Sequence, residues 1–167
     1  KGGKMELAEV LRLGRQMASA LAAAHSAGVI HRDLKPSNVM IVRDPDVAGG
    51  ERAKVFDFGI AKVSTRANHD KRLTQVGWFM GTRFYSAPEQ QSDSASVDDK
   101  ADVYSLGIVL YEMLGGVLPL QHPLKTARFV PAWLMQLLTR MTTASAELRP
   151  TMQQVVTAFE QGASERL

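Results

Sequence analysis

The stretch HRDLKPSN at residues 31–38 decides how the rest of this chain is interpreted. It lies between a long helical pattern over residues 6–27 and a short apolar run, so it is predicted to be a loop held at both ends by regular structure. Within the loop, Asp33 is suited to accept a proton, Lys35 to neutralise phosphate charge, and Asn38 to give an oxygen ligand to a metal ion. The stretch indicates a chemical site but does not by itself name a reaction.

A second short motif, Asp57-Phe58-Gly59, follows a predicted strand and comes nineteen residues after Asn38. A carboxylate at Asp57, close to a glycine that lets the backbone turn, is suited to hold Mg²⁺ near phosphate groups. A single aspartate in either motif would more often be a turn or cap residue than a catalyst. The two motifs therefore carry weight only in combination.

The pattern around these motifs is mostly helical. Amphipathic or apolar periodicity predicts helices over residues 6–27 and 101–114, from Pro131 onward, and from Met152 to about Gln161. Thr151 and Gln154 form a capping-box pair before the last helix. Two short apolar runs, 39–42 and 53–56, predict a hairpin with a wide turn, whereas the polar residues 60–100 predict a loop. The expected fold class is mainly α with a small β-hairpin.

Composition excludes several classes of protein. The 167 residues are enough for one domain with its own core. Lys and Arg number 20 against 17 Asp and Glu, and a net charge of +3 does not indicate a nucleic-acid or membrane partner. The absence of cysteine excludes disulfides and thiolate metal sites. The longest apolar stretch, residues 103–114, is shorter than a membrane span, so no membrane segment is predicted in the chain.

Several motifs then follow one another in a recognisable order. After HRDLKPSN come DFG at 57–59, GTRFYSAPEQ at 81–90, DVYSLGIVLYEML at 102–114 and Arg149-Pro150. With these motifs the chain resembles the C-terminal lobe of a serine/threonine protein kinase of the eukaryotic-like type found in bacteria. The resemblance covers nearly the whole chain. It implies that residues 1–167 are the C-terminal lobe only of a kinase catalytic domain, with the N-terminal lobe absent.

The resemblance implies roles for the residues of both motifs. Asp33 would accept the proton of the substrate hydroxyl, and Lys35 would neutralise charge on the γ-phosphoryl group of ATP. Asn38 and Asp57 would hold the Mg²⁺ ions that bridge the phosphates, and Met40 would pack beneath the adenine. The implied cofactors are therefore ATP and Mg²⁺, and the implied substrate is a serine or threonine hydroxyl of a protein.

The resemblance also implies regulation. Arg32 marks the kinases whose activation segment is ordered by phosphorylation, because a guanidinium pairs with a phosphate. Thr74 is the favoured phosphate acceptor, with Ser64 and Thr65 as other candidates and an ordinary solvated loop residue as the alternative. Thr82, together with the lysine of the catalytic loop, resembles the serine/threonine branch rather than the tyrosine branch.

Other residues are implied to be structural. Asp102 would hold the backbone of the catalytic loop, and Glu89 and Arg149 would form a buried ion pair that anchors the activation segment. His31 is interpreted as structural through backbone contacts. His25, on the inner face of the first helix, is interpreted as a packed core histidine rather than a ligand.

The sequence is compatible with two functions. The first is an ATP-dependent serine/threonine kinase that acts on proteins when its missing N-terminal lobe completes it. The second is a catalytically incomplete lobe that serves as a binding or scaffold module, favoured by the short connection over residues 115–130, which leaves little room for substrate docking. The intact set of catalytic and metal-binding residues favours the first. The lobe is expected in the cytoplasm, where ATP is, with a membrane tether in the parent protein left open.

Overall fold

The computed structural model describes residues 5–58, 84–92, 97–115 and 130–164. It is mostly helical with one two-stranded sheet, as the sequence predicts. The helices are α1 (Leu7–Ser26), α4 (Pro88–Ser92), α5 (Lys100–Gly115), α6 (Ala132–Met141) and α7 (Met152–Ser164), with 3₁₀ turns at Pro36–Asn38 and Ala146–Leu148. The strands are β1 (Val39–Arg43) and β2 (Glu51–Val55).

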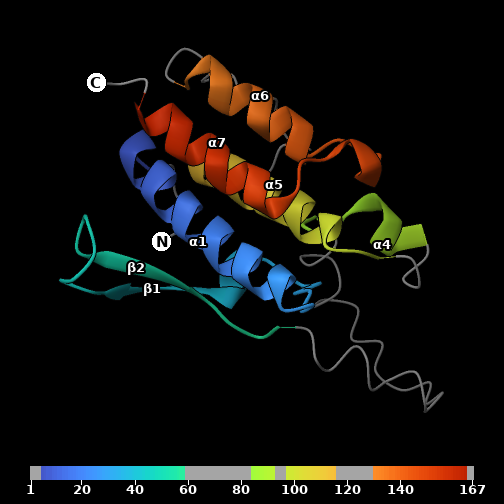
Figure 1. The fold of residues 1–167 in the computed structure, drawn as a ribbon, viewed down its shortest axis with the longest axis horizontal. Coiled ribbons are helices and arrows are strands. Elements are labelled where there is room, and N and C mark those ends of the chain that lie inside the picture. The colour runs from blue at the N-terminus through green and yellow to red at the C-terminus, as the bar shows by residue number, and fades with distance from the viewer. Residues whose placement is uncertain (1–4, 59–83, 93–96, 116–129, 165–167) are drawn as a thin grey trace.

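The elements are arranged in layers around α5. In Figure 1, α1 and α7 run side by side, α5 lies behind them, α6 lies beyond α7, and the hairpin lies along the other side of α1. Buried side chains of α1, α5, α6 and α7 form one continuous core. Since α5 is buried on most of its surface, it serves as the central element against which the others pack.

A glycine allows the three long helices to come close together. A Cβ atom added to Gly14 of α1 would lie 2.7 Å from Cδ2 of Leu110 on α5 and 3.0 Å from Cζ of Phe159 on α7. These separations are shorter than ordinary van der Waals contacts, so a larger residue would displace the ends of these two buried side chains. The small residue therefore lets Leu110 and Phe159 pack directly against the backbone of α1.

The hairpin has the predicted wide turn. Its strands pair in the antiparallel sense, with Val39 opposite Val55 at the open end. At the other end, the N–H of Asp44 donates to the carbonyl of Gly50 over 3.0 Å, which closes the turn. Gly50 has a φ of 69°, a left-handed conformation that glycine adopts without steric cost.

Two polar side chains of α1 hold the hairpin in place. The Oε1 atom of Gln16 accepts the N–H of Ala53 (2.7 Å), and its Nε2 atom donates to the carbonyl of Glu51 (3.1 Å). Arg12 donates to the same carbonyl (2.9 Å) and pairs with the Glu51 carboxylate (2.7 Å). The side chain of Gln16 thus binds the first half of β2 as a neighbouring strand would, and it holds the hairpin against α1.

The structure differs from the sequence prediction in the described part of residues 60–100. We predicted a loop there, but Pro88–Ser92 form the short helix α4 and α5 already begins at Lys100. Five residues are too few to show a helical apolar repeat, which explains the wrong prediction. Residues 59–83 and 116–129 lie outside the described part of the chain. No helix in the described ranges is both long and apolar enough to cross a membrane.

Truncation of a core leucine should measure how far the fold depends on α5. Leu110 is fully buried against Gly14 of α1, so Leu110→Ala should lower the free energy of unfolding by about 2–5 kcal/mol in urea titrations. Leu148 is 67% exposed, and Leu148→Ala should change the free energy of unfolding by less than about 0.5 kcal/mol. Equal losses in the two variants would contradict this description of the core.

Candidate active site

The loop after α1 and the chain that leaves β2 meet at Phe56. The N–H of Phe56 donates to the carbonyl of Asn38 over 3.1 Å, and its carbonyl accepts a hydrogen bond of 2.9 Å from Nε2 of His31. The rings of His31 and Phe58 lie in contact, with their centroids 4.7 Å apart. Asp57 stands between these two anchored phenylalanines, so its backbone is held beside the loop, and its side chain is exposed.

His31 is fully buried and has one permitted tautomer. Its Nδ1 atom accepts the N–H of Asp33 over 3.2 Å, so the ring proton must be on Nε2, where it is donated to the carbonyl of Phe56. The ring is therefore neutral and connects the two motifs through backbone groups. This is the structural role that we expected for it.

Three side chains of the loop form one polar cluster. The Nζ atom of Lys35 lies 3.0 Å from Oδ2 of Asp33, and both side chains are about three-quarters buried. Asn38 is buried, and its Nδ2 atom donates to the carbonyl of Asp33 over 2.8 Å. An acidic group, a cation and an amide oxygen thus lie within six residues of the chain, and they can orient a hydroxyl, neutralise an anion and bind a metal ion.

Asp102 of α5 holds the start of this loop through hydrogen bonds to its backbone. It is fully buried, and its two oxygens accept the N–H groups of His31 and Arg32, each over 2.8 Å. Arg32 has a φ of 64°, a left-handed conformation that is costly for a residue with a side chain, by about 1–3 kcal/mol. The two hydrogen bonds to a buried carboxylate offset this cost and keep the loop in one conformation.

The side chain of His25 is only 7% exposed, and two carboxylates lie beside its ring. Its Nε2 atom bonds to Oδ2 of Asp102 over 2.8 Å, and its Nδ1 atom lies 3.7 Å from Oδ2 of Asp99. The histidine is therefore packed, as we expected, and in addition it supports the carboxylate that holds the loop. The pairing joins residues 77 positions apart, and no local pattern in the sequence could indicate it.

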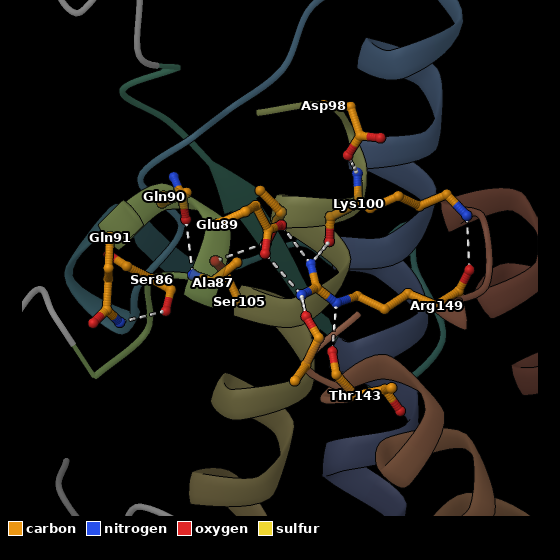
Figure 2. Close-up of polar contacts among 12 residues, drawn as sticks. Ser86, Ala87, Glu89, Gln90, Gln91, Asp98, Lys100, Ser105, Thr143 and Arg149 are labelled. Atoms are coloured by element: carbon orange, nitrogen blue, oxygen red, sulfur yellow. Dashed lines mark hydrogen bonds and ion pairs between the residues drawn. The ribbon is translucent and has the colours of Figure 1, made fainter. Parts of the chain in front are cut away.

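Arg149 and Glu89 anchor α4 to the C-terminal part of the chain (Figure 2). Nη1 and Nη2 of Arg149 donate to the two carboxylate oxygens of Glu89 over 2.6 and 2.9 Å. The remaining N–H groups donate to the carbonyls of Thr143 (2.8 Å), Lys100 (3.1 Å) and Ala144 (2.9 Å). All five donors of a buried guanidinium are therefore used, which is the condition under which a buried charge is tolerated.

The carboxyl group of Glu89 responds to two opposed effects. Burial acts to raise its pKa, but the hydrogen bonds and charge of Arg149 outweigh burial and hold the pKa below the ordinary value. A lowered pKa in the folded state stabilises the fold above the ordinary pKa of a glutamate. This contribution is lost as the pH falls through the lowered pKa.

The chain before α4 is fixed to α5 as well. The hydroxyl of Tyr85 donates to Oε2 of Glu112 over 2.6 Å, and Oγ of Ser105 donates to the carbonyl of Tyr85 over 2.7 Å. Burial, together with the hydrogen bond to Glu112, raises the pKa of Tyr85 well above the ordinary tyrosine value, so the phenol keeps its proton. The segment 84–92 is thus held at Tyr85 and at α4.

The remaining predicted site residues have different outcomes. Met40 lies on β1 with 52% of its surface exposed, on the strand that leaves the loop. The predicted regulatory residues Thr74 and Thr82 lie outside the described residues, as do Gly59 and the alternative phosphate acceptors Ser64 and Thr65. No role was predicted for Gln90 of α4, although its Nε2 atom donates to the carbonyl of Arg32 over 2.8 Å.

Removal of the guanidinium should destabilise the fold strongly. Arg149→Met would leave Glu89 without its cationic partner, and we expect the free energy of unfolding to fall by about 3–5 kcal/mol in urea titrations. Arg140 is exposed in the last turn of α6, so Arg140→Met is the matched control and should change stability by less than about 0.5 kcal/mol. A loss below 1 kcal/mol for Arg149→Met would show that the pair does not anchor α4.

Several known proteins are similar to this chain in sequence or in fold. Serine/threonine-protein kinase A of Synechocystis sp. is 35% identical over 178 residues, which cover 91% of this chain and 33% of that protein. Serine/threonine-protein kinase pkn3 of Myxococcus xanthus is 43% identical over 112 residues, which cover 67% of this chain and 20% of that protein. The chain therefore spans between a fifth and a third of the length of these two curated relatives.

A solved structure agrees with these relatives. The crystal structure of the Mycobacterium tuberculosis PknI kinase domain, a double mutant, is 27% identical with a TM-score of 0.65 over 96% of this chain and 57% of that chain. The described fold is thus kinase-like. The sequence profile described as "Protein kinase domain" matches residues 1–159, and the chain belongs to that family.

Proposed function

We propose that this chain is the C-terminal lobe of a kinase catalytic domain. When an N-terminal lobe completes it, the domain transfers the γ-phosphoryl group of ATP to serine or threonine hydroxyls of proteins. One observation carries the proposal: Asp33, Lys35 and Asn38 form one cluster, and hydrogen bonds to Phe56 bring Asp57 to the same loop. The family and the names of the relatives support the same reaction.

Positioning and charge explain the chemistry of the cluster. The Asp33 carboxylate would orient the attacking hydroxyl and accept its proton, while the ammonium group of Lys35 would neutralise negative charge on the phosphoryl group in transfer. The distance of 3.0 Å between these two groups means that a hydroxyl at Asp33 would also lie near the lysine. The protein therefore needs no covalent intermediate, because alignment and electrostatic stabilisation supply the catalysis.

The residues of the loop and strand end also fit a magnesium ion. Asn38 and Asp57 would hold it with an amide oxygen and a carboxylate, which are the hard oxygen ligands that Mg²⁺ prefers. Within the described ranges, no group of three or more histidine and acidic side chains could enclose a metal ion. The ion would therefore take its other ligands from phosphate oxygens and water, and it would neutralise phosphate charge.

Nucleotide binding and regulation belong to the same proposal. Met40 is exposed beside the loop and would give an apolar surface to the adenine ring. Phosphorylation of Thr74, paired with Arg32, would order the activation segment, and Thr82 would contribute to the choice of serine and threonine. Such a lobe would face the cytoplasm, the compartment that supplies ATP, and its partners would be the N-terminal lobe and protein substrates.

Substitution of the proposed base tests this function. In the chain joined to its N-terminal lobe, Asp33→Asn should lower kcat for transfer of labelled γ-phosphate to a serine- and threonine-rich protein by at least about 100-fold. Circular dichroism should remain unchanged, since the amide keeps the size of the side chain. Asp46→Asn, in the exposed hairpin turn, is the matched control and should keep full activity. Normal turnover by Asp33→Asn would rule out Asp33 as the base, whereas no turnover by the unaltered chain joined to its N-terminal lobe would favour a binding or scaffold function.

A further inference from the structure

The peptide group that joins Arg32 to Asp33 is held at both of its polar atoms by side chains. Its N–H, on Asp33, donates to Nδ1 of His31 over 3.2 Å. Its carbonyl, on Arg32, accepts a hydrogen bond of 2.8 Å from Nε2 of Gln90. The direction of the Asp33 side chain follows from the plane of this peptide group, because the plane fixes the backbone nitrogen of Asp33.

This peptide group needs such support. Arg32 is left-handed, with a φ of 64°, and the hydrogen bond from its own N–H to Asp102 fixes only the preceding peptide group. Rotation about ψ of Arg32 would turn its carbonyl and the N–H of Asp33 together without disturbing the contact with Asp102. The hydrogen bond from Gln90 to the carbonyl opposes this rotation, and the bond from the N–H to His31 opposes it on the other side of the peptide group.

Gln90 is itself oriented at both ends of its amide. Its Oε1 atom accepts the N–H of the buried Ala87 over 2.9 Å, so its Nε2 atom is directed to the carbonyl of Arg32, and only this orientation of the amide satisfies both partners (Figure 2 shows the contact with Ala87). The helix that carries Gln90 is anchored by the ion pair of Glu89 and Arg149. Gln90 therefore connects a fixed segment to the backbone of the loop.

Its neighbour Gln91 provides the contrast. Gln91 is exposed on the same helix, and within the described residues its Nε2 atom makes a long contact of 3.3 Å with the carbonyl of Ser86, five residues earlier. The two glutamines have the same side chain and the same helix propensity. They differ in that Gln90 alone reaches the loop, across 58 residues of sequence.

We propose that Gln90 is a positioning residue for Asp33, which transmits the placement of segment 84–92 to the catalytic loop. The inference rests on the proposed role of Asp33 as the base. When segment 84–92 is out of place, Nε2 of Gln90 withdraws from the carbonyl of Arg32. The Asp33 carboxylate then loses its alignment with the substrate hydroxyl. The state of that segment would thereby reach the reacting groups by a second route, separate from the pairing of Arg32 with a phosphate.

Amide hydrogen exchange on this chain tests the contact without any need for activity. Gln90→Met keeps the length of the side chain and removes both hydrogen bonds, whereas Gln90→Glu keeps an acceptor for Ala87 and removes the donor for Arg32. In both variants the amide of Asp33 should exchange about tenfold faster, the effect of one lost hydrogen bond. Gln91→Met should leave that rate unchanged. An unchanged Asp33 rate in both Gln90 variants would overturn the proposal.

Kinetics of the chain joined to its N-terminal lobe provide the second readout. Both Gln90 variants should lower kcat about tenfold while the KM for ATP stays within about twofold, because alignment of the base is lost and nucleotide contacts are not. Equal falls in Gln91→Met, or a normal kcat despite faster exchange at Asp33, would contradict a positioning role. Full activity of Asp33→Asn would instead disprove the role of Asp33 as the base, and no activity of the unaltered completed chain would disprove the proposed function; the exchange result would stand in either case.

Discussion

The buried carboxylate of Asp102 is the constraint on which the site depends. It accepts hydrogen bonds from two backbone N–H groups and from His25, and it has no exposure to solvent. A buried charge of this kind is stable only when its partners are in place, so the loop and the helix that carries Asp102 hold each other. Because α5 is the central helix of the core, the packing of the whole fold sets the position of the loop.

From Asp102 the hydrogen bonds extend in two directions. One passes through the His31 ring to Phe56, and so to the carboxylate that would hold the metal ion. The other passes from the carbonyl of Arg32 through Gln90 to α4, which the Arg149 pair anchors. Each contact joins segments that are far apart in sequence. The polar site therefore exists only in the folded chain, and small changes in α4 or in the end of β2 reach the same few backbone groups.

Much of the fold could be predicted because the local signals were strong. The apolar repeat predicted α1 with both ends within one residue, and the capping box is present, with the N–H of Thr151 bound to Gln154 and the N–H of Gln154 bound to the Thr151 hydroxyl. The strand β2 begins at Glu51, two residues before the predicted start, because its first residues are charged and show no apolar run. Local patterns thus sufficed wherever a long element has a buried face.

The site was only partly predictable. Motif order selected the residues with chemistry on the loop, but the partners of His25 and Gln90 could not be found from the sequence. The residues around His25 and Gln90 do not indicate what these side chains contact, because their partners lie 77 and 58 residues away in the sequence. Helix α4 was missed for a related reason, because contacts with distant segments stabilise it rather than its own repeat.

Calorimetric titration of this chain with ATP, with and without Mg²⁺, shows whether the loop and the end of β2 form one nucleotide and metal site. We expect binding that requires Mg²⁺ and that is weakened at least about tenfold in Asp57→Ala, the effect of one lost metal ligand. The exposed turn residue Asp46 supplies the control, and Asp46→Ala should bind as the unaltered chain does. Binding that is independent of Mg²⁺ or unchanged in Asp57→Ala, or no binding at all, would contradict such a site.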